Sequence, residues 1–92
     1  RKSRDARGIL ICDSAHGMTI QANRFKGIRA AHCTDAYSAA KAKEHNNANI
    51  ICLGGRITGV DLALTIVDAY LGAEFEGGRH QTRVDKIMAL EK

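Results

Sequence analysis

Cys12 has the setting of a chemically reactive side chain. It ends the apolar run of residues 8–11, and a loop of small and polar residues follows it, from Asp13 to Gly17. Such a run predicts a buried parallel strand, and α/β proteins place catalytic groups and binding loops at the carboxyl ends of these strands. A helical pattern begins directly after the loop, which would bring backbone N–H groups behind the thiol. We therefore expect Cys12 and this loop at the centre of the function.

Three apolar runs separated by helical patterns must position this loop. Thr34 is predicted to cap the second helix, and Thr58, with Asp61 three residues later, to cap the third. Gly72 suits the position just after the third helix. The predicted strands are residues 8–12, 28–33 and 48–53, and the predicted helices are residues 17–25, 35–44, 59–71 and 79–91. The predicted apolar faces are Ala36, Tyr37, Ala39 and Ala40 on the second helix, and Val60, Ala63, Leu64, Val67, Tyr70 and Leu71 on the third.

The order β-α-β-α-β-α-α predicts an α/β fold with a parallel sheet and right-handed crossover helices. If the three strands add in one direction, both crossover helices cover the same face. A three-stranded sheet covered so unevenly is marginal alone. We expect further N-terminal sequence, a partner subunit, or both, to pack against it.

Composition narrows the function further. The 92 residues carry a formal net charge of +4, without a basic stripe or interleaved aromatic residues, so we expect neither nucleic acid nor a membrane as partner. The three cysteines, Cys12, Cys33 and Cys52, lie at the ends of apolar runs, which argues against a disulfide framework and favours a reducing cytoplasm. Because the chain begins at Arg1 rather than Met, we expect it to be one small domain or part of a longer one.

Five spaced motifs resemble ribose-5-phosphate isomerase B and the wider family that includes the galactose-6-phosphate isomerase subunits. The resemblance extends from residue 8 to about residue 90. The motifs are Cys12 to Asn23, Gly27 to Ala30, Lys43 to Asn46, Gly54 to Arg56, and Glu76 to Arg83.

The resemblance implies a Rossmann-like, three-layer parallel sheet in a tight homodimer or higher oligomer with shared active sites. Family members carry about two further βα units at the N-terminus, and the first of these ends in an Asp-His pair. The implied activity is aldose–ketose isomerisation of a sugar phosphate through an enediolate, as from ribose 5-phosphate to ribulose 5-phosphate in the pentose phosphate pathway. Neither a metal nor a cofactor is required. Residues 1–92 would then be a single sugar-phosphate isomerase domain or part of one.

The resemblance also assigns roles to the loop after the first strand. Cys12 matches the base, Ser14 matches a residue that contacts the sugar ring oxygen, and the backbone from Asp13 to Gly17 matches the loop that holds the enediolate oxygens. For Cys12 the alternative is a buried structural cysteine, and for Ser14 it is a helix N-cap. The family loop usually reads Cys-Gly-Thr-Gly-x-Gly, so Asp13 and Ala15 replace glycines. A positive φ would strain either residue, and the Asp13 carboxylate would oppose an oxyanion unless it points away. His16 is the donor expected to compensate for this charge.

The remaining matched residues fall at two ends of the sheet. His45 matches the ring-opening histidine and Asn46 an oxyanion-hole amide. A crossover helix runs antiparallel to its strands, so His45 should lie opposite Cys12 and serve a neighbouring subunit, together with the phosphate-binding pair Arg79 and Arg83. The predicted catalytic residues are Cys12, Ser14 and His45, and the predicted substrate-binding residues are Asp13, Ala15, His16, Gly17, Asn46, Arg56, Arg79 and Arg83.

Each of these matches has a simpler alternative. Arg56 follows the third strand on the Cys12 side and would bind phosphate in its own subunit, yet any of the arginines is equally a solvated surface charge. His45 is equally a surface histidine stabilised by a helix C-terminus. His32 and His80 receive no role. The altered loop also leaves open a non-catalytic relative that binds a phosphosugar or a partner chain.

Overall fold

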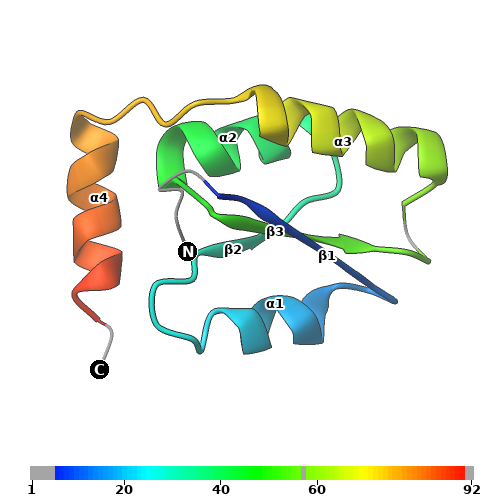
Figure 1. Cartoon of the computed structure of the whole chain (residues 1–92), viewed down its shortest axis with the longest axis horizontal. Helices are drawn as coiled ribbons and strands as arrows, with labels where there is room; N and C mark the ends of the chain where they lie inside the picture. Colours follow the sequence, from blue (N-terminus) through cyan, green and yellow to red (C-terminus); the bar gives the residue numbers. More distant parts are fainter. Residues whose placement is uncertain (1–5, 57, 91–92) are drawn as a thin grey trace.

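A computed structural model describes residues 6–56 and 58–90, and it shows a parallel sheet between helices (Figure 1). The predicted α/β class and element order are confirmed. The strands are β1 (Gly8–Cys12), β2 (Ala30–His32) and β3 (Ile50–Gly54), and the helices are α1 (His16–Ala22), α2 (Ala36–Asn46), α3 (Val60–Gly72) and α4 (Arg79–Met88). In the part of the chain that is described, no helix is long and apolar enough to cross a bilayer.

The strand order is β1-β3-β2, so the strands do not add in one direction. Both outer strands pair in parallel with β3, which brings Cys12 opposite Gly54 and His32 opposite Cys52. The chain moves outward from β1 to β2 and then back to β3, and right-handed crossovers therefore place α1 and α2 on opposite faces. Figure 1 shows α1 on one face and α2 with α3 on the other. The expectation that both crossover helices share a face is wrong for this order.

The main core lies between β3 and the helices α2 and α3. The phenol of Tyr70 is fully buried and donates a hydrogen bond of 2.7 Å to the carbonyl oxygen of Ala48. This bond ties the end of α3 to the residues before β3. The buried cluster consists of Cys33, Ala39, Ala42, Ala48, Ile51, Leu53, Ile66 and Tyr70.

Asparagine side chains explain why two elements are shorter than predicted. The Asn23 amide accepts a hydrogen bond from the Ala30 N–H at 2.8 Å and donates one to the Ala30 carbonyl at 2.9 Å, so it ends α1 and occupies the outer edge of β2. The Arg29 N–H donates to Asn49 Oδ1 at 2.8 Å instead of joining the strand ladder. Local side-chain bonds of this kind compete with regular secondary structure.

Several predicted helix ends also differ from the structure. Asp35, not Thr34, is the N-cap of α2 and accepts a hydrogen bond from the Ser38 N–H at 2.7 Å. Gly59 precedes α3 without a side-chain cap, while Thr58 Oγ1 is buried and has no hydrogen-bond partner within residues 6–56 and 58–90. Gly72 is the last residue of α3 rather than the residue after it. Helix α4 ends at Met88, and residue 91 of its predicted range lies outside the described residues.

The predicted apolar helix faces are only partly buried. On α3, Tyr70 and the unpredicted Ile66 are buried, whereas Val60, Leu64 and Leu71 are exposed. The apolar stripe of α3 is wider than the part of the helix that packs against α2, so one edge of the stripe remains exposed. On α2, Tyr37 is likewise exposed.

Candidate active site

The Cys12 thiol lies against the backbone of the loop that follows it. The N–H of Ala15 donates a hydrogen bond of 3.1 Å to Cys12 Sγ. The side chain is half-buried, so the sulfur is held by a donor and remains accessible. A thiolate is stabilised when a backbone N–H points at it, which makes this an arrangement suited to a base or nucleophile. We call residues 12–17 the thiol loop.

Ala15 shows where the thiol loop is strained. It is fully buried, has a φ of 73°, and stands immediately before α1 as its N-cap. This left-handed conformation costs a residue with a Cβ atom about 1–2 kcal/mol. Asp13, the other residue at a family glycine position, is not among the residues with positive φ. The predicted strain therefore occurs at Ala15 alone, and it accompanies the backbone turn that aims the N–H at Cys12.

The rest of the thiol loop rests on the end of β3. A Cβ atom added at Gly54 would lie 3.1 Å from the carbonyl oxygen of Asp13 and 3.1 Å from the carbonyl carbon of Ser14. The strand therefore requires glycine there so that the loop can approach. Ser14 is half-buried and makes no capping bond to α1, so its N-cap alternative is wrong.

Charged and aromatic side chains surround the thiol loop. The exposed Asp13 carboxylate lies 3.7 Å from Arg56 Nε, and the Arg56 N–H donates to the Asp13 carbonyl at 3.1 Å. Arg56 therefore lies on the Cys12 side, and it partly neutralises the carboxylate. Exposed His16, the first residue of α1, contacts His32 edge to face with ring centroids 5.0 Å apart. His32 Nε2 is buried without a hydrogen-bond partner among the described residues. Gly17 is exposed in the first turn of α1.

His45 and Asn46 lie at the other end of the sheet. They are the last two residues of α2, which runs back from the end where β1 and β3 finish, as Figure 1 shows. His45 is half-exposed and Asn46 is exposed. The structure therefore brings residues 12–17 and Arg56 together, and it separates them from His45.

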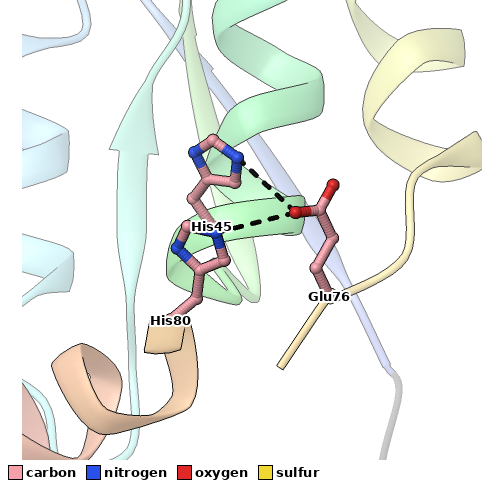
Figure 2. Close-up of side chains that lie close together, drawn as sticks. All are labelled: His45, Glu76 and His80. Carbon is pink, nitrogen blue, oxygen red and sulfur yellow. Dashed lines mark ion pairs between the residues drawn. The ribbon is translucent and has the colours of Figure 1, made fainter. Parts of the chain in front are cut away.

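Glu76 and His80, to which the sequence analysis assigned no role, lie beside His45. Figure 2 shows the carboxylate of Glu76 beside the rings of His45 and His80, with Oε1 at 3.7 Å and 3.6 Å from their Nε2 atoms. The two rings are stacked, with centroids 4.1 Å apart and an interplanar angle of 9°. We call His45, Glu76 and His80 the histidine cluster. Sequence reasoning missed it because its residues come from two places 31 positions apart, and only the i, i+4 spacing of Glu76 and His80 gave a signal.

Positive charge gathers around this cluster. Arg79 and Arg83 are exposed on the first turns of α4, four residues apart, as a shared phosphate would require. Burial lowers the pKa of the His80 imidazole, and the neighbouring His45 and Arg79 side chains lower it further, against the opposing effect of Glu76. His80 is therefore neutral at pH 7. This end of the molecule can attract an anion with two guanidinium groups beside a pair of imidazole rings.

Comparison with known proteins shows the family of this chain. A family model described as Ribose/Galactose Isomerase matches residues 1–87. The chain belongs to this family. Its fold is that of the solved members: ribose-5-phosphate isomerase B of Clostridium thermocellum has a TM-score of 0.90 and 57% sequence identity, and the match covers 91% of this chain and 57% of that one.

Further members of the ribose/galactose isomerase family agree. Ribose-5-phosphate isomerase B of Escherichia coli is 52% identical over 85 residues, which are 92% of this chain and 57% of the relative. The same enzyme of Mycoplasma genitalium, solved with bound ribulose-5-phosphate, has a TM-score of 0.88 and 46% identity over 90% of this chain and 55% of that one. The chain thus spans a little over half the length of the relatives it matches.

Proposed function

We propose that this chain is the part of a sugar-phosphate isomerase that supplies the catalytic base and, to a partner subunit, the ring-opening and phosphate-binding residues. The observation that carries the proposal is the hydrogen bond from the Ala15 N–H to Cys12 Sγ, in a chain of the ribose/galactose isomerase family. The reaction interconverts an aldose phosphate and a ketose phosphate. Ribose 5-phosphate is the substrate favoured by the name of the Escherichia coli relative.

Cys12 is the proposed base. Its thiolate removes the proton from C2 of the open-chain aldose, the electron pair of the broken C–H bond forms the C1–C2 double bond, and the π pair of the C1 carbonyl moves onto O1 to give an enediolate. The hydroxyl proton of O2 then passes to O1, the C2 carbonyl forms, and the thiol returns its proton to C1 to give the ketose. The thiol ends the cycle as a thiolate, and no electron acceptor is needed. A half-buried thiol held by a backbone donor suits this proton shuttle.

The thiol loop is the proposed site for the enediolate oxygens. Backbone N–H groups from Asp13 to Gly17 would face the developing negative charge, as donors do in oxyanion holes. Ser14 would contact the ring oxygen before ring opening, and His16 is the nearest additional donor. Arg56 keeps the Asp13 carboxylate paired, which reduces its repulsion of the oxyanion.

The second half of the site is proposed to come from a partner subunit. His45 opens the sugar ring, Asn46 donates to an oxyanion, and Arg79 and Arg83 hold the phosphate. The support is their position at the end of the sheet opposite Cys12 (Figure 1), which prevents them from reaching the thiol of their own chain. A homodimer with shared sites meets this geometry, in a single isomerase domain to which residues 1–92 contribute. The free thiols suit a reducing cytoplasm.

Replacing Cys12 by Ala in the complete gene product tests the base. We expect the turnover of ribose 5-phosphate to fall by a factor of about 10²–10⁴, the usual contribution of a general base, while the circular dichroism spectrum is kept. Cys33→Ala removes another thiol, buried in the core, and is the matched control, whose folded fraction should keep its turnover. Equal activity of Cys12→Ala and the wild type would exclude Cys12 as the base.

A non-catalytic phosphosugar-binding relative is the second candidate. The observations that favour it are the strained Ala15 and the carboxylate of Asp13 beside the proposed oxyanion site. Binding of ribose 5-phosphate by calorimetry without turnover, in the complete wild-type gene product, would establish this alternative. Turnover of either ribose 5-phosphate or a hexose 6-phosphate would exclude it.

A further inference from the structure

The histidine cluster combines three groups that bind metal ions. His45, Glu76 and His80 each offer one ligand atom, and these atoms all lie within 4.8 Å of one another. Imidazole nitrogen and carboxylate oxygen are the donors of many sites for Zn²⁺ and related ions. Two histidines and one glutamate also form a complete set of protein ligands for an ion that keeps one position open.

The distances match a metal site better than a hydrogen-bonded one. Glu76 Oε1 lies 3.7 Å from His45 Nε2 and 3.6 Å from His80 Nε2, beyond the range of a hydrogen bond. Bonds of 2.0–2.1 Å in a tetrahedral site place neighbouring ligand atoms about 3.3–3.4 Å apart. The carboxylate oxygen is therefore within a few tenths of an ångström of the position that a shared ion requires.

The backbone holds the three ligands near one another. The Glu76 N–H donates a hydrogen bond of 3.0 Å to the carbonyl oxygen of Glu44, the residue before His45. The His80 N–H donates at 3.0 Å to the carbonyl of Gly77, whose φ of 71° turns the chain between the two ligands. His80 is buried, so its ring has little freedom to leave. The ligands thus come from the end of α2, the loop after α3 and the first turn of α4 (Figure 2).

We propose that the histidine cluster binds one divalent transition-metal ion, with Zn²⁺ as the best match, through His45 Nε2, Glu76 Oε1 and His80 Nε2. Mg²⁺ and Ca²⁺ are disfavoured because they prefer an all-oxygen shell. Because the two rings are parallel, one must turn about its Cβ–Cγ bond to aim its lone pair at the ion. His45 is half-exposed and can make this turn, whereas His80 stays in place.

The surrounding charge affects the expected affinity of the histidine cluster for a metal ion. Arg79 and Arg83 lie on either side of His80 in α4, and their positive charges disfavour a divalent cation there. An anion bound to these arginines would offset that repulsion. Metal and phosphate are therefore expected to bind cooperatively, with a higher affinity for Zn²⁺ in the presence of inorganic phosphate.

Metal binding would also withdraw His45 from ring opening, a consequence that rests on the proposed function. The isomerase would then be inhibited by Zn²⁺ and restored by a chelator. This follows because His45 Nε2, once bound to the metal, has neither a free lone pair nor a proton to exchange with the sugar. The binding itself is independent of any activity, so the two proposals fail separately.

Calorimetric titration of the tag-free complete gene product with Zn²⁺ at pH 7.5 tests the site, and Co²⁺ absorption reports its geometry. We expect one ion per chain and a tetrahedral visible spectrum. Glu76→Gln and His80→Asn each remove one ligand, and each should weaken binding at least about tenfold. Thermal melting of the metal-free variants shows whether they are folded, and Glu76→Gln, at a half-exposed side chain, keeps the test usable if His80→Asn is not.

Exposed carboxylates on α3 provide the matched controls. Asp61→Asn and Asp68→Asn make the same change from carboxylate to amide as Glu76→Gln, at side chains outside the histidine cluster. Both variants should bind Zn²⁺ as the wild type does. The proposal is overturned if Glu76→Gln binds Zn²⁺ unchanged, if Asp61→Asn or Asp68→Asn abolishes binding, or if the folded wild type binds no ion at millimolar Zn²⁺.

Discussion

The two ends of the sheet build their candidate functional groups in different ways. At the carboxyl end, the thiol loop is one contiguous stretch of sequence, and contacts of its main chain hold it in place. The Ala15 N–H donates a hydrogen bond to Cys12 Sγ, and the loop backbone packs against Gly54. At the opposite end, the histidine cluster joins side chains from two distant segments. In the proposed reaction, the first end would bind the reacting part of the sugar through fixed backbone donors, and the second would bind its far end through movable rings and charged side chains.

The difference explains why neither end suffices for the proposed reaction. The thiol loop has the proposed base and donors, and the cation beside it among the described residues is Arg56, which is paired with Asp13. The histidine cluster has Arg79 and Arg83 nearby, and none of the three described cysteines belongs to it. A site assembled from the thiol loop of one subunit and the histidine cluster of another would combine the proposed base with the proposed ring-opening and phosphate-binding residues.

Subunit complementation gives the largest expected effect. Cys12→Ala and His45→Ala should each be nearly inactive in the complete gene product. Mixed after unfolding and refolding together, half of the dimers combine the two variants, and each of these has one intact site. We expect about a quarter of the wild-type turnover to return, because a two-fold dimer exchanges the two halves symmetrically. Turnover that stays at the level of the single variants would show that each site lies within one chain.

Thiol alkylation compares the ends of the two outer strands, β1 and β2. Cys33 follows β2 and is buried, and this burial raises its pKa to about 11, so about one molecule in a thousand carries the thiolate at pH 8. Cys12, half-buried at the end of β1, should react with iodoacetamide at least about a hundredfold faster in the native protein. Peptide mass spectrometry over time measures both rates. In urea the two rates should become similar, and a difference that persisted there would contradict burial as the cause.

Gly54→Ala tests whether main-chain packing fixes the thiol loop. The new Cβ atom would lie 3.1 Å from backbone atoms of Asp13 and Ser14, which cannot move like a flexible side chain. We expect a loss of about 1–3 kcal/mol in the free energy of unfolding, measured in urea. Gly72→Ala is the matched control, since it meets nothing within 4 Å at the end of α3, and it should be neutral or stabilising by up to about 1 kcal/mol. Equal effects at both glycines would contradict the close approach.

The sequence predicted the parts of this molecule that local rules determine. Cys12, its loop and Arg56 follow from the ends of apolar runs, and the separation of His45 follows from the antiparallel course of a crossover helix. The strand order could not be predicted from these local rules, because the insertion of β3 between β1 and β2 depends on burying that strand from both sides. The histidine cluster does not follow either, since the distance between His45 and Glu76 is set by the turn from α3 into α4.

Ala15→Gly gives the smallest expected effect and isolates the strain in the thiol loop. Glycine adopts the φ of 73° without a steric penalty, so the free energy of unfolding should rise by about 0.5–1 kcal/mol, after its greater freedom in the unfolded chain is subtracted. Ala22→Gly makes the same change in the last turn of α1, where φ is helical, and should lower stability by about 1 kcal/mol. Opposite signs in the two urea titrations would locate the strain at Ala15. Destabilisation by both changes would show that the left-handed turn costs this chain nothing, and the thiol loop would then differ from the histidine cluster in construction but not in stored strain.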